Sequence, residues 1–269
     1  MILGQKKLVN KISNLNLDTC PRSIMLIGQE GSGRHELVQL LGEKLGLEVV
    51  DITENISLET IFQIQGNPNP SIYLINGLEL TVKEENCVIK FLEEPTQNAY
   101  IVFRTEDAGL CLPTIRSRCI QWELEPYSIS ELKKENIYSD LPDYYFDIFR
   151  TPGQLDSARD LPINDMIALA NKILDKIGNA NLSNTLTLTR FFAFKKNNTD
   201  ENLYDIRIFL KVLLYCANKA LIENRLVNPN MYFLTSEFIQ KCAVKNVDYK
   251  YAFENYLVQL RMLVRKGAN

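Results

Sequence analysis

The chain has 269 residues, of which 46% are hydrophobic and 23% charged, and its formal net charge is −3. This length suits two or three domains with buried cores, and the hydrophobic content excludes a disordered chain. A slightly negative net charge argues against a chain that binds nucleic acid by its overall charge. No apolar run approaches the roughly 20 residues that span a bilayer, and the N-terminal residues lack an apolar signal core. We therefore expect a cytoplasmic protein with no membrane partner.

The charges are unevenly distributed along the chain. The first 160 residues carry 15 basic and 24 acidic residues, whereas the rest carry 15 basic and 9 acidic ones. An acidic N-terminal part and a basic C-terminal part suit assembly between subunits, although solvated helix faces that happen to differ in charge explain the same distribution. The six cysteines form no C-x-x-C pair, so their spacing predicts neither a metal site nor a disulfide framework.

The first half of the chain alternates between short apolar runs and helical periodicity. The apolar runs predict five strands, at Ser23–Ile27, Glu48–Ile52, Ser71–Ile75, Ala99–Phe103 and Cys119–Leu124. Apolar residues at helical spacing predict one helix from Gly33 to Leu45 and another over Thr81–Glu93, which Pro95 ends. Strands that alternate with helices predict an α/β fold, with a parallel sheet covered by helices on both faces.

The strand signal fades after Pro126. Residues 128–160 predict short helices, with Ser128 or Ser130 as an N-cap, and residues 164–177, 203–224, 233–244 and 249–265 predict longer ones. We therefore expect an α/β domain over residues 1–126, a small helical domain over 127–161 and a helical bundle over 162–269.

A glycine-rich loop connects the first expected strand to the following helix. Its spacing, Gly28-x-x-x-x-Gly33, is typical of a phosphate-binding loop, in which backbone N–H groups and the helix N-terminus hold the anion. The candidate phosphate-binding residues are Gly28, Gly31, Ser32, Gly33, Arg34 and His35. A tight turn without a ligand would show the same spacing.

This loop lacks the residues that hydrolysis needs. A lysine would reach the β- and γ-phosphates and a Ser or Thr hydroxyl would hold Mg²⁺, but these places carry Arg34 and His35. Arginine keeps the charge but is a bulkier, planar group, and imidazole is a poor substitute for a hydroxyl ligand of a hard cation. His35, which is the single histidine of the chain, is expected to fill space or to lie weakly against a phosphate.

Two later segments resemble a known family. The segment Asn86–Pro95 contains Leu-Glu-Glu-Pro, and after a strand the chain reads Leu-Pro-Thr-Ile-Arg-Ser-Arg-Cys over residues 112–119. In this order and spacing they resemble AAA+ clamp-loader subunits, and most closely the delta' subunits of bacterial DNA polymerase III. The resemblance covers residues 1 to about 160. It implies an AAA+ parallel-sheet P-loop domain followed by a small helical lid domain and an all-α collar domain for oligomerisation.

The family resemblance also implies a function. It implies a non-catalytic subunit of a hetero-oligomeric clamp loader within the DNA polymerase III holoenzyme, with other loader subunits, the sliding clamp and, through the complex, primer-template DNA as partners in DNA replication. Arg118 would be an arginine finger, supplied in trans to the ATP site of a neighbouring subunit. Arg116 would be a local interface or ion-pair residue. A surface cation beside a strand remains the alternative for Arg118.

The chain differs from the family at the residues that bind metal ions and activate water. An Asp that orders Mg²⁺ and a Glu that activates water are replaced by Asn76 and Gly77. Delta' subunits usually carry a four-cysteine zinc module, but this chain has no cysteine between Cys20 and Cys87. Glu106 and Asp107 follow the fourth strand, where they would repel ATP or, as we prefer, form a solvated turn. We therefore expect a degenerate Walker A loop, no intrinsic ATPase activity and no cofactor, neither zinc nor ATP.

Two alternatives remain open at this point. One is an AAA+ ATPase with an unorthodox pocket in which Arg34 replaces the lysine. The other is a stand-alone replication adaptor that keeps the scaffold and binds a polymerase or clamp partner.

Overall fold

The computed structural model describes residues 3–76, 80–93, 96–177, 181–194, 204–226, 228–242 and 247–266. The chain forms two compact units. The first, which we call the α/β unit, comprises Met1–Leu141 and Arg150–Ser157, and the second, the helical unit, comprises Pro142–Phe149 and Ala158–Asn269. Residues 127–161, expected as a separate lid, are thus shared between the two units, and the division into three domains stays a prediction.

The α/β unit is built on a five-stranded sheet in which every pair of neighbouring strands is parallel. The strand order is β2-β3-β4-β1-β5. The strands are β1 (Ser23–Ile27), β2 (Glu48–Asp51), β3 (Ser71–Asn76), β4 (Ala99–Thr105) and β5 (Ile120–Glu123). All five strands were predicted from the sequence. The β4 strand runs two residues further than its apolar run, because Arg104 and Thr105 still pair with Leu26 and Ile27.

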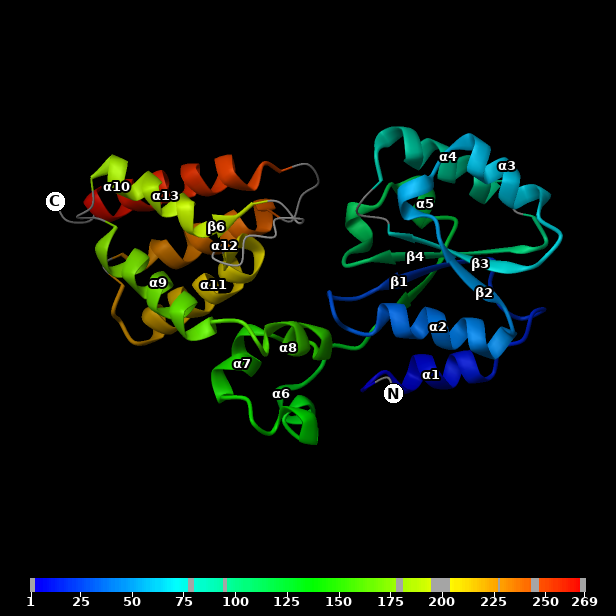
Figure 1. The fold of residues 1–269 in the computed structure, drawn as a ribbon, viewed down its shortest axis with the longest axis horizontal. Coiled ribbons are helices and arrows are strands. Elements are labelled where there is room, and N and C mark those ends of the chain that lie inside the picture. The colour runs from blue at the N-terminus through cyan, green and yellow to red at the C-terminus, as the bar shows by residue number, and fades with distance from the viewer. Residues whose placement is uncertain are drawn as a thin grey trace. The chain divides into compact units, whose positions relative to one another are not determined.

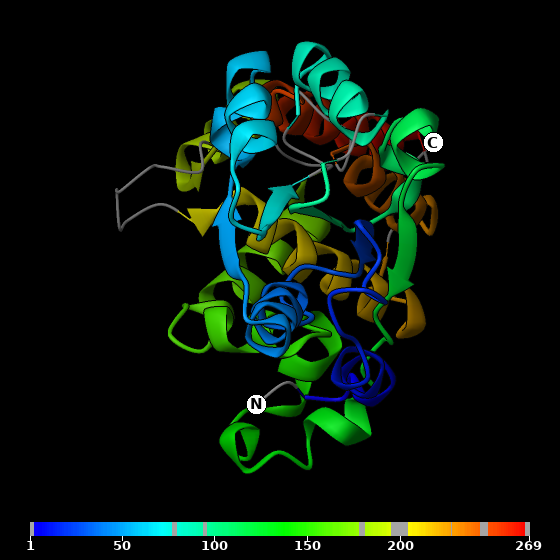
Figure 2. The ribbon, with the colours of Figure 1, turned by 90° about the vertical axis from the view of Figure 1, so that its right-hand side faces the viewer.

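Helices cover both faces of this sheet (Figure 1). The helices α1 (Lys6–Ser13) and α2 (Arg34–Leu45) lie on one face, and α3 (Leu58–Gly66), α4 (Val82–Glu93) and α5 (Pro113–Arg116) on the other. Figure 2 shows this layering from the side, with the dark-blue and blue helices α1 and α2 below the strands and the cyan and teal helices α3 and α4 above them. The α/β fold expected from the sequence, a parallel sheet with helices on both faces, is confirmed.

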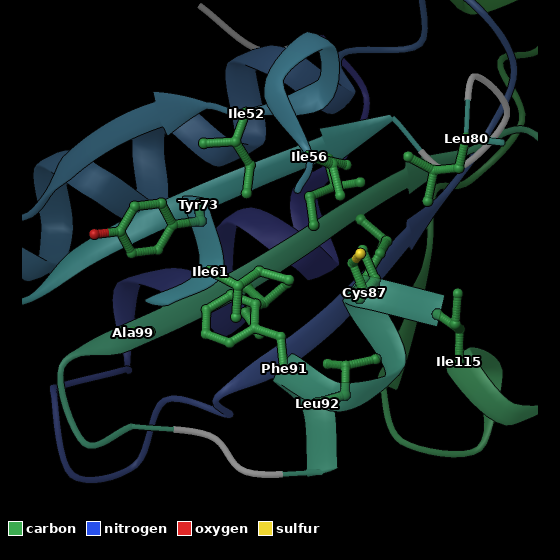
Figure 3. Packing of buried hydrophobic residues seen from close by; sticks show 14 of the residues in the cluster. Ile52, Ile56, Ile61, Tyr73, Leu80, Cys87, Phe91, Leu92, Ala99 and Ile115 are labelled. Carbon is green, nitrogen blue, oxygen red and sulfur yellow. The ribbon is translucent and has the colours of Figure 1, made fainter. Parts of the chain in front are cut away.

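Successive side chains of a strand point to opposite faces of the sheet, and this creates one hydrophobic core on each face. Ile72 and Leu74 of β3 pack with α1 and α2, whereas Tyr73 and Ile75 pack with α3 and α4, as the two-residue period of a strand requires. Phe91 of α4 is fully buried in the core between the sheet and the helices α3, α4 and α5. Figure 3 shows its ring among side chains from β3, α3, α4 and α5.

Short helices complete the α/β unit. They are the 3₁₀ turns Thr53–Asn55, Ala108–Leu110 and Asn136–Tyr138, α6 (Ile129–Leu132) and α8 (Pro152–Ala158), whose last residue belongs to the helical unit. The N-cap predicted at Ser128 is confirmed: its hydroxyl accepts from the N–H of Glu131 at 3.2 Å, and the Glu131 carboxylate accepts from the N–H of Ser128. This reciprocal capping box satisfies donors that a helix start leaves open.

The helical unit packs its helices around an aromatic core. They are α7 (Asp143–Ile148), α9 (Ile163–Lys176), α10 (Leu182–Leu186), the 3₁₀ turn Thr187–Phe191, α11 (Ile206–Ile222), α12 (Asn230–Cys242) and α13 (Tyr249–Lys266). The buried rings of Phe209, Phe253 and Tyr256 contribute to this core, and the Tyr256 hydroxyl shares a hydrogen bond of 2.8 Å with Thr235. No described helix in either unit contains an apolar stretch long enough to cross a membrane.

One feature of the helical unit differs from the all-α expectation. Two residues of β6 (Phe192–Ala193) pair in parallel with β7 (Tyr204–Asp205). The Phe192 ring lies 4.5 Å from that of Phe209 and 5.1 Å from that of Phe253. This packing fixes an extended segment too short to give a strand signal in the sequence.

We expect Phe91→Ala to lower the free energy of unfolding of the α/β unit by about 3–5 kcal/mol, because the ring is fully buried and its loss leaves a cavity. Urea unfolding followed by a probe within this unit measures the change. The matched control is Phe62→Ala, since Phe62 on α3 is 68% exposed, and its effect should stay within about 0.5 kcal/mol. Equal losses in the two variants would contradict this packing.

Candidate functional site

The glycine-rich loop lies between β1 and α2, at the carboxyl edge of the sheet. Gly31 and Gly33 have φ angles of +74° and +97°, which side chains other than glycine rarely adopt. The N–H of Gly28 donates to the carbonyl of Thr105 at 3.0 Å, and a Cβ at position 28 would lie 2.9 Å from that of Leu124. The glycines are thus required by the backbone of the loop itself, whether or not a ligand binds.

The loop keeps the backbone donors of a phosphate site. Gly33 precedes α2, and no side chain caps this helix start within the described residues. The N–H groups of the first helical turn are therefore available to an anion. Of the predicted site residues, Ser32 is buried, whereas His35 is exposed on this turn.

The cation that replaces the expected lysine is turned toward an acidic neighbour. The Arg34 side chain is only 15% exposed, and its Nη2 lies 3.9 Å from Oε1 of Glu106. Burial lowers the pKa of Arg34, while Glu106 acts in the opposite direction; the guanidinium stays protonated at neutral pH. Glu106 is 46% exposed, so the turn after β4 is solvated, as expected, and also supplies a counter-charge to Arg34.

A second ion pair lies at the same edge of the sheet. Nη2 of Arg104, on β4, is 3.0 Å from Oδ2 of Asp51, at the end of β2. The other oxygen of Asp51 accepts from the N–H and the hydroxyl of Thr53, and that hydroxyl accepts from the N–H of Asn76. The backbone N–H of Asn76, at the end of β3, thus joins a hydrogen-bond network that includes this ion pair, while Gly77 lies outside the described residues.

The start of α8 is fastened to the loop. Thr151 and Gln154 both donate side-chain hydrogen bonds to the carbonyl of Glu30, at 2.7 and 3.1 Å. The N–H of Gly153 donates to the carbonyl of Gly31 at 3.0 Å, and a Cβ at Gly31 would lie 2.7 Å from the Gln154 nitrogen. This contact requires glycine at position 31 for a second reason.

A small cavity of about 200 Å³ adjoins the loop. Its lining includes Ser32, Tyr127 and the carboxylate-bearing residues Glu106, Glu123 and Glu125. The Ser32 hydroxyl is buried without a hydrogen-bond partner among the described atoms, and the Tyr127 hydroxyl donates to the carbonyl of Ser32 at 2.9 Å. The volume is below the roughly 300 Å³ at which ligand pockets usually begin, and the acidic lining disfavours a polyphosphate.

Arg118 lies two residues after α5, on the other helical layer of the unit. Ile115 anchors α5 in the core with 2% of its surface exposed, whereas the Arg118 side chain is 35% exposed. Nη1 of Arg118 donates to the carbonyl of Thr114 at 2.9 Å, and Nη2 lies 2.8 Å from Oε1 of Glu93. The side chain is therefore held at the surface and is not part of the core.

The cysteine after Arg118 is structural. Burial raises the pKa of the Cys119 thiol to about 12, so that it is not a nucleophile at neutral pH. All six cysteines are free thiols. Among the described residues, no group of three or more His, Cys, Asp or Glu side chains is placed to hold a metal ion. The absence of zinc stays a prediction.

No local pattern in the sequence indicates the Glu93–Arg118 pair, the Arg104–Asp51 pair or the contact of Thr151 and Gln154 with the loop. Arg104 carried one signal, because it is a charged residue that directly extends the apolar run Ala99–Phe103. The arginine-finger role of Arg118 and phosphate binding by Gly28, Gly31, Ser32, Gly33, Arg34 and His35 stay predictions.

Comparisons with known proteins give matches from one replication system. Residues 48–128 match the family model described as "DNA polymerase III, delta subunit". The chain is 34% identical over 91 residues to DNA polymerase III subunit delta' of Haemophilus influenzae, covering 34% of this chain and 27% of that protein. It is 26% identical over 166 residues to DNA polymerase III subunit gamma of Buchnera aphidicola subsp. Schizaphis graminum, covering 49% of this chain and 46% of that protein. The chain therefore spans about a quarter to a half of the curated relatives it matches.

Among solved structures, a DNA polymerase III, gamma subunit-related protein from Thermotoga maritima is similar over 97% of this chain and 99% of its own. The sequence identity is 18% and the TM-score is 0.45.

We expect Gly31→Ala to destabilise the α/β unit by about 1–3 kcal/mol, because alanine is strained at a φ of +74° and its Cβ would press on Gln154. Hydrogen exchange at the Gly153 amide should accelerate as its bond to Gly31 is lost. Gly66→Ala is the control, because a Cβ there meets nothing within 4 Å. Unchanged exchange at Gly153 in the Gly31 variant would contradict this contact.

Proposed function

We propose that this chain, whose matches support a delta'-like clamp-loader subunit, acts in the loader without hydrolysing ATP in its own pocket and supplies Arg118 in trans to a neighbouring ATP site. The resemblance to delta' subunits expected from the sequence is confirmed by the family model over residues 48–128 and by the delta' and gamma relatives. The non-catalytic role and the arginine finger are the parts that we infer.

The exposed guanidinium of Arg118 is the observation that carries this proposal. It lies in the Ser-Arg-Cys segment, its side chain is 35% exposed, and part of its hydrogen-bonding capacity is not used by Thr114 and Glu93. A guanidinium placed against the γ-phosphate of a neighbouring ATP would neutralise the charge that grows there in the transition state.

The chain's own pocket supports the other half of the proposal. The Arg34 cation is directed to Glu106, three acidic residues line the adjoining cavity, and Asn76 stands at the end of β3 where a carboxylate would order Mg²⁺. Asn76 and Gly77 leave no carboxylate at the positions expected to order Mg²⁺ and to activate water, and the acidic lining of the cavity would repel a polyphosphate. We infer that neither ATP nor zinc is a cofactor of this chain.

The proposed partners follow from the relatives, not from a surface seen in this structure. They are the other clamp-loader subunits in a hetero-oligomer, the sliding clamp and, through the complex, primer-template DNA in the cytoplasm.

One observation favours the alternative of an unorthodox ATPase: the first turn of α2 keeps its N–H groups uncapped, next to the Arg34 cation. The adaptor alternative has no comparable support in the structure.

We expect Arg118→Ala to lower the ATPase rate at the neighbouring site by about 10³-fold or more, because the transition-state charge loses its counter-cation. Single-turnover hydrolysis by the reconstituted loader measures this rate. Arg116→Ala is the matched control, since it removes the same side chain two positions away. Arg118→Ala complexes that assemble and hydrolyse ATP at the wild-type rate would contradict the finger.

The purified chain alone should show neither ATP hydrolysis nor measurable heat of Mg-ATP binding in calorimetry. Tight Mg-ATP binding with turnover would favour the unorthodox ATPase instead. In that case Arg34→Ala should abolish the binding, because it removes the cation that substitutes for lysine.

A further inference from the structure

We propose that Glu93 is a positioning residue for Arg118, holding its guanidinium in the orientation from which it meets the phosphate of a neighbouring subunit. This inference rests on the proposed in-trans role of Arg118. It starts from an ion pair between residues 25 positions apart, with Nη2 of Arg118 and Oε1 of Glu93 separated by 2.8 Å.

Both members of the pair are attached to anchored elements. Glu93 is the last residue of α4, directly after Phe91 and Leu92, which are 0% and 7% exposed. Arg118 follows α5, which Ile115 fixes in the same core. Figure 3 shows Leu92 and Ile115 close together, on α4 and α5 respectively. The backbones that carry the carboxylate and the guanidinium are thus fixed relative to each other by a common core.

The guanidinium is held at two points. Nη1 donates to the carbonyl of Thr114 at 2.9 Å, while Nη2 donates to Glu93. Two acceptors on different terminal nitrogens define the plane of the group, whereas one alone would let it rotate. Since a guanidinium has five N–H donors, three remain for a phosphate, and the side chain is still 35% exposed.

Stability alone does not explain the pair. The side chains of Glu93 and Arg118 are 48% and 35% exposed, and ion pairs at such exposure contribute little to folding because water and salt screen them. Ordering of the Arg118 side chain before it acts is an effect separate from the stability of the fold. An arginine side chain has many rotamers, and a finger held in its working orientation loses less conformational entropy when it engages the transition state.

The opposite role would also use this ion pair. If Glu93 were a restraint that Arg118 must leave before it acts, removing the carboxylate would speed hydrolysis. Positioning and restraint therefore predict changes of opposite sign, and one variant decides between them.

The experiment uses the full chain reconstituted with its loader subunits. We expect Glu93→Ala to lower kcat on the order of tenfold, as for a misplaced reactive group, with the KM for ATP and complex assembly unchanged. Glu93→Gln should recover most of the rate, because its carbonyl oxygen accepts the same hydrogen bond. Glu59→Ala, which removes an exposed glutamate on α3, should match the wild type.

A wild-type or faster rate in Glu93→Ala overturns the positioning role, and so does a fall in rate that comes entirely from KM. If Glu93→Ala does not assemble, Glu93→Asp decides, because the carboxylate is withdrawn by one methylene group: an intermediate kcat is expected, and a wild-type kcat overturns the proposal. Arg118→Ala in the same assay separates the two hypotheses. A wild-type rate there refutes the finger itself, whereas a loss there with none in the Glu93 variants refutes Glu93 alone.

Discussion

The parallel sheet of the α/β unit brings all five strand ends to one edge, where two arginines pair with acidic residues. Strand β1 lies between β4 and β5, so the loop after β1 meets the residues that follow both neighbours. Arg34 reaches Glu106 beyond β4, and Arg104 reaches Asp51 at the end of β2. Ligands of open α/β sheets usually bind at this edge. Here its arginines already have internal partners.

The same fold leaves a different arginine available. Arg34 is 15% exposed and Arg118 is 35% exposed, and each has an acidic partner. The partner of Arg34 lines the small acidic cavity beside the loop, while the partner of Arg118 is the last residue of α4. This asymmetry links the two halves of the proposed function: the cation of the loop is engaged internally, and the cation after α5 is ordered at the surface.

The sequence predicted those parts of the fold that depend on local pattern. Apolar runs such as Ser23–Ile27 placed the five strands, and Ser128 was one of the two N-cap candidates for the short helix that follows. The two-residue strands β6 and β7 were missed because ring packing around Phe192, not an apolar run, fixes them. The sequence also placed the glycine loop and Arg118 as candidates, since both lie in contiguous motifs.

The side-chain partners at the site could not be read from spacing. Glu93 and Arg118 are 25 positions apart, Asp51 and Arg104 are 53 apart, and Thr151 bonds to Glu30 across 121 positions. Only the tertiary packing of α4, α5, α8 and the sheet brings these groups together, and no local periodicity encodes it. The most direct measurement is a structure of the assembled loader with an ATP analogue. Our account predicts the Arg118 guanidinium within hydrogen-bond distance of a phosphate bound by the adjacent subunit, and no nucleotide on the loop 28–33. Nucleotide with Mg²⁺ on that loop, with Arg118 remote from every neighbouring phosphate, would contradict it.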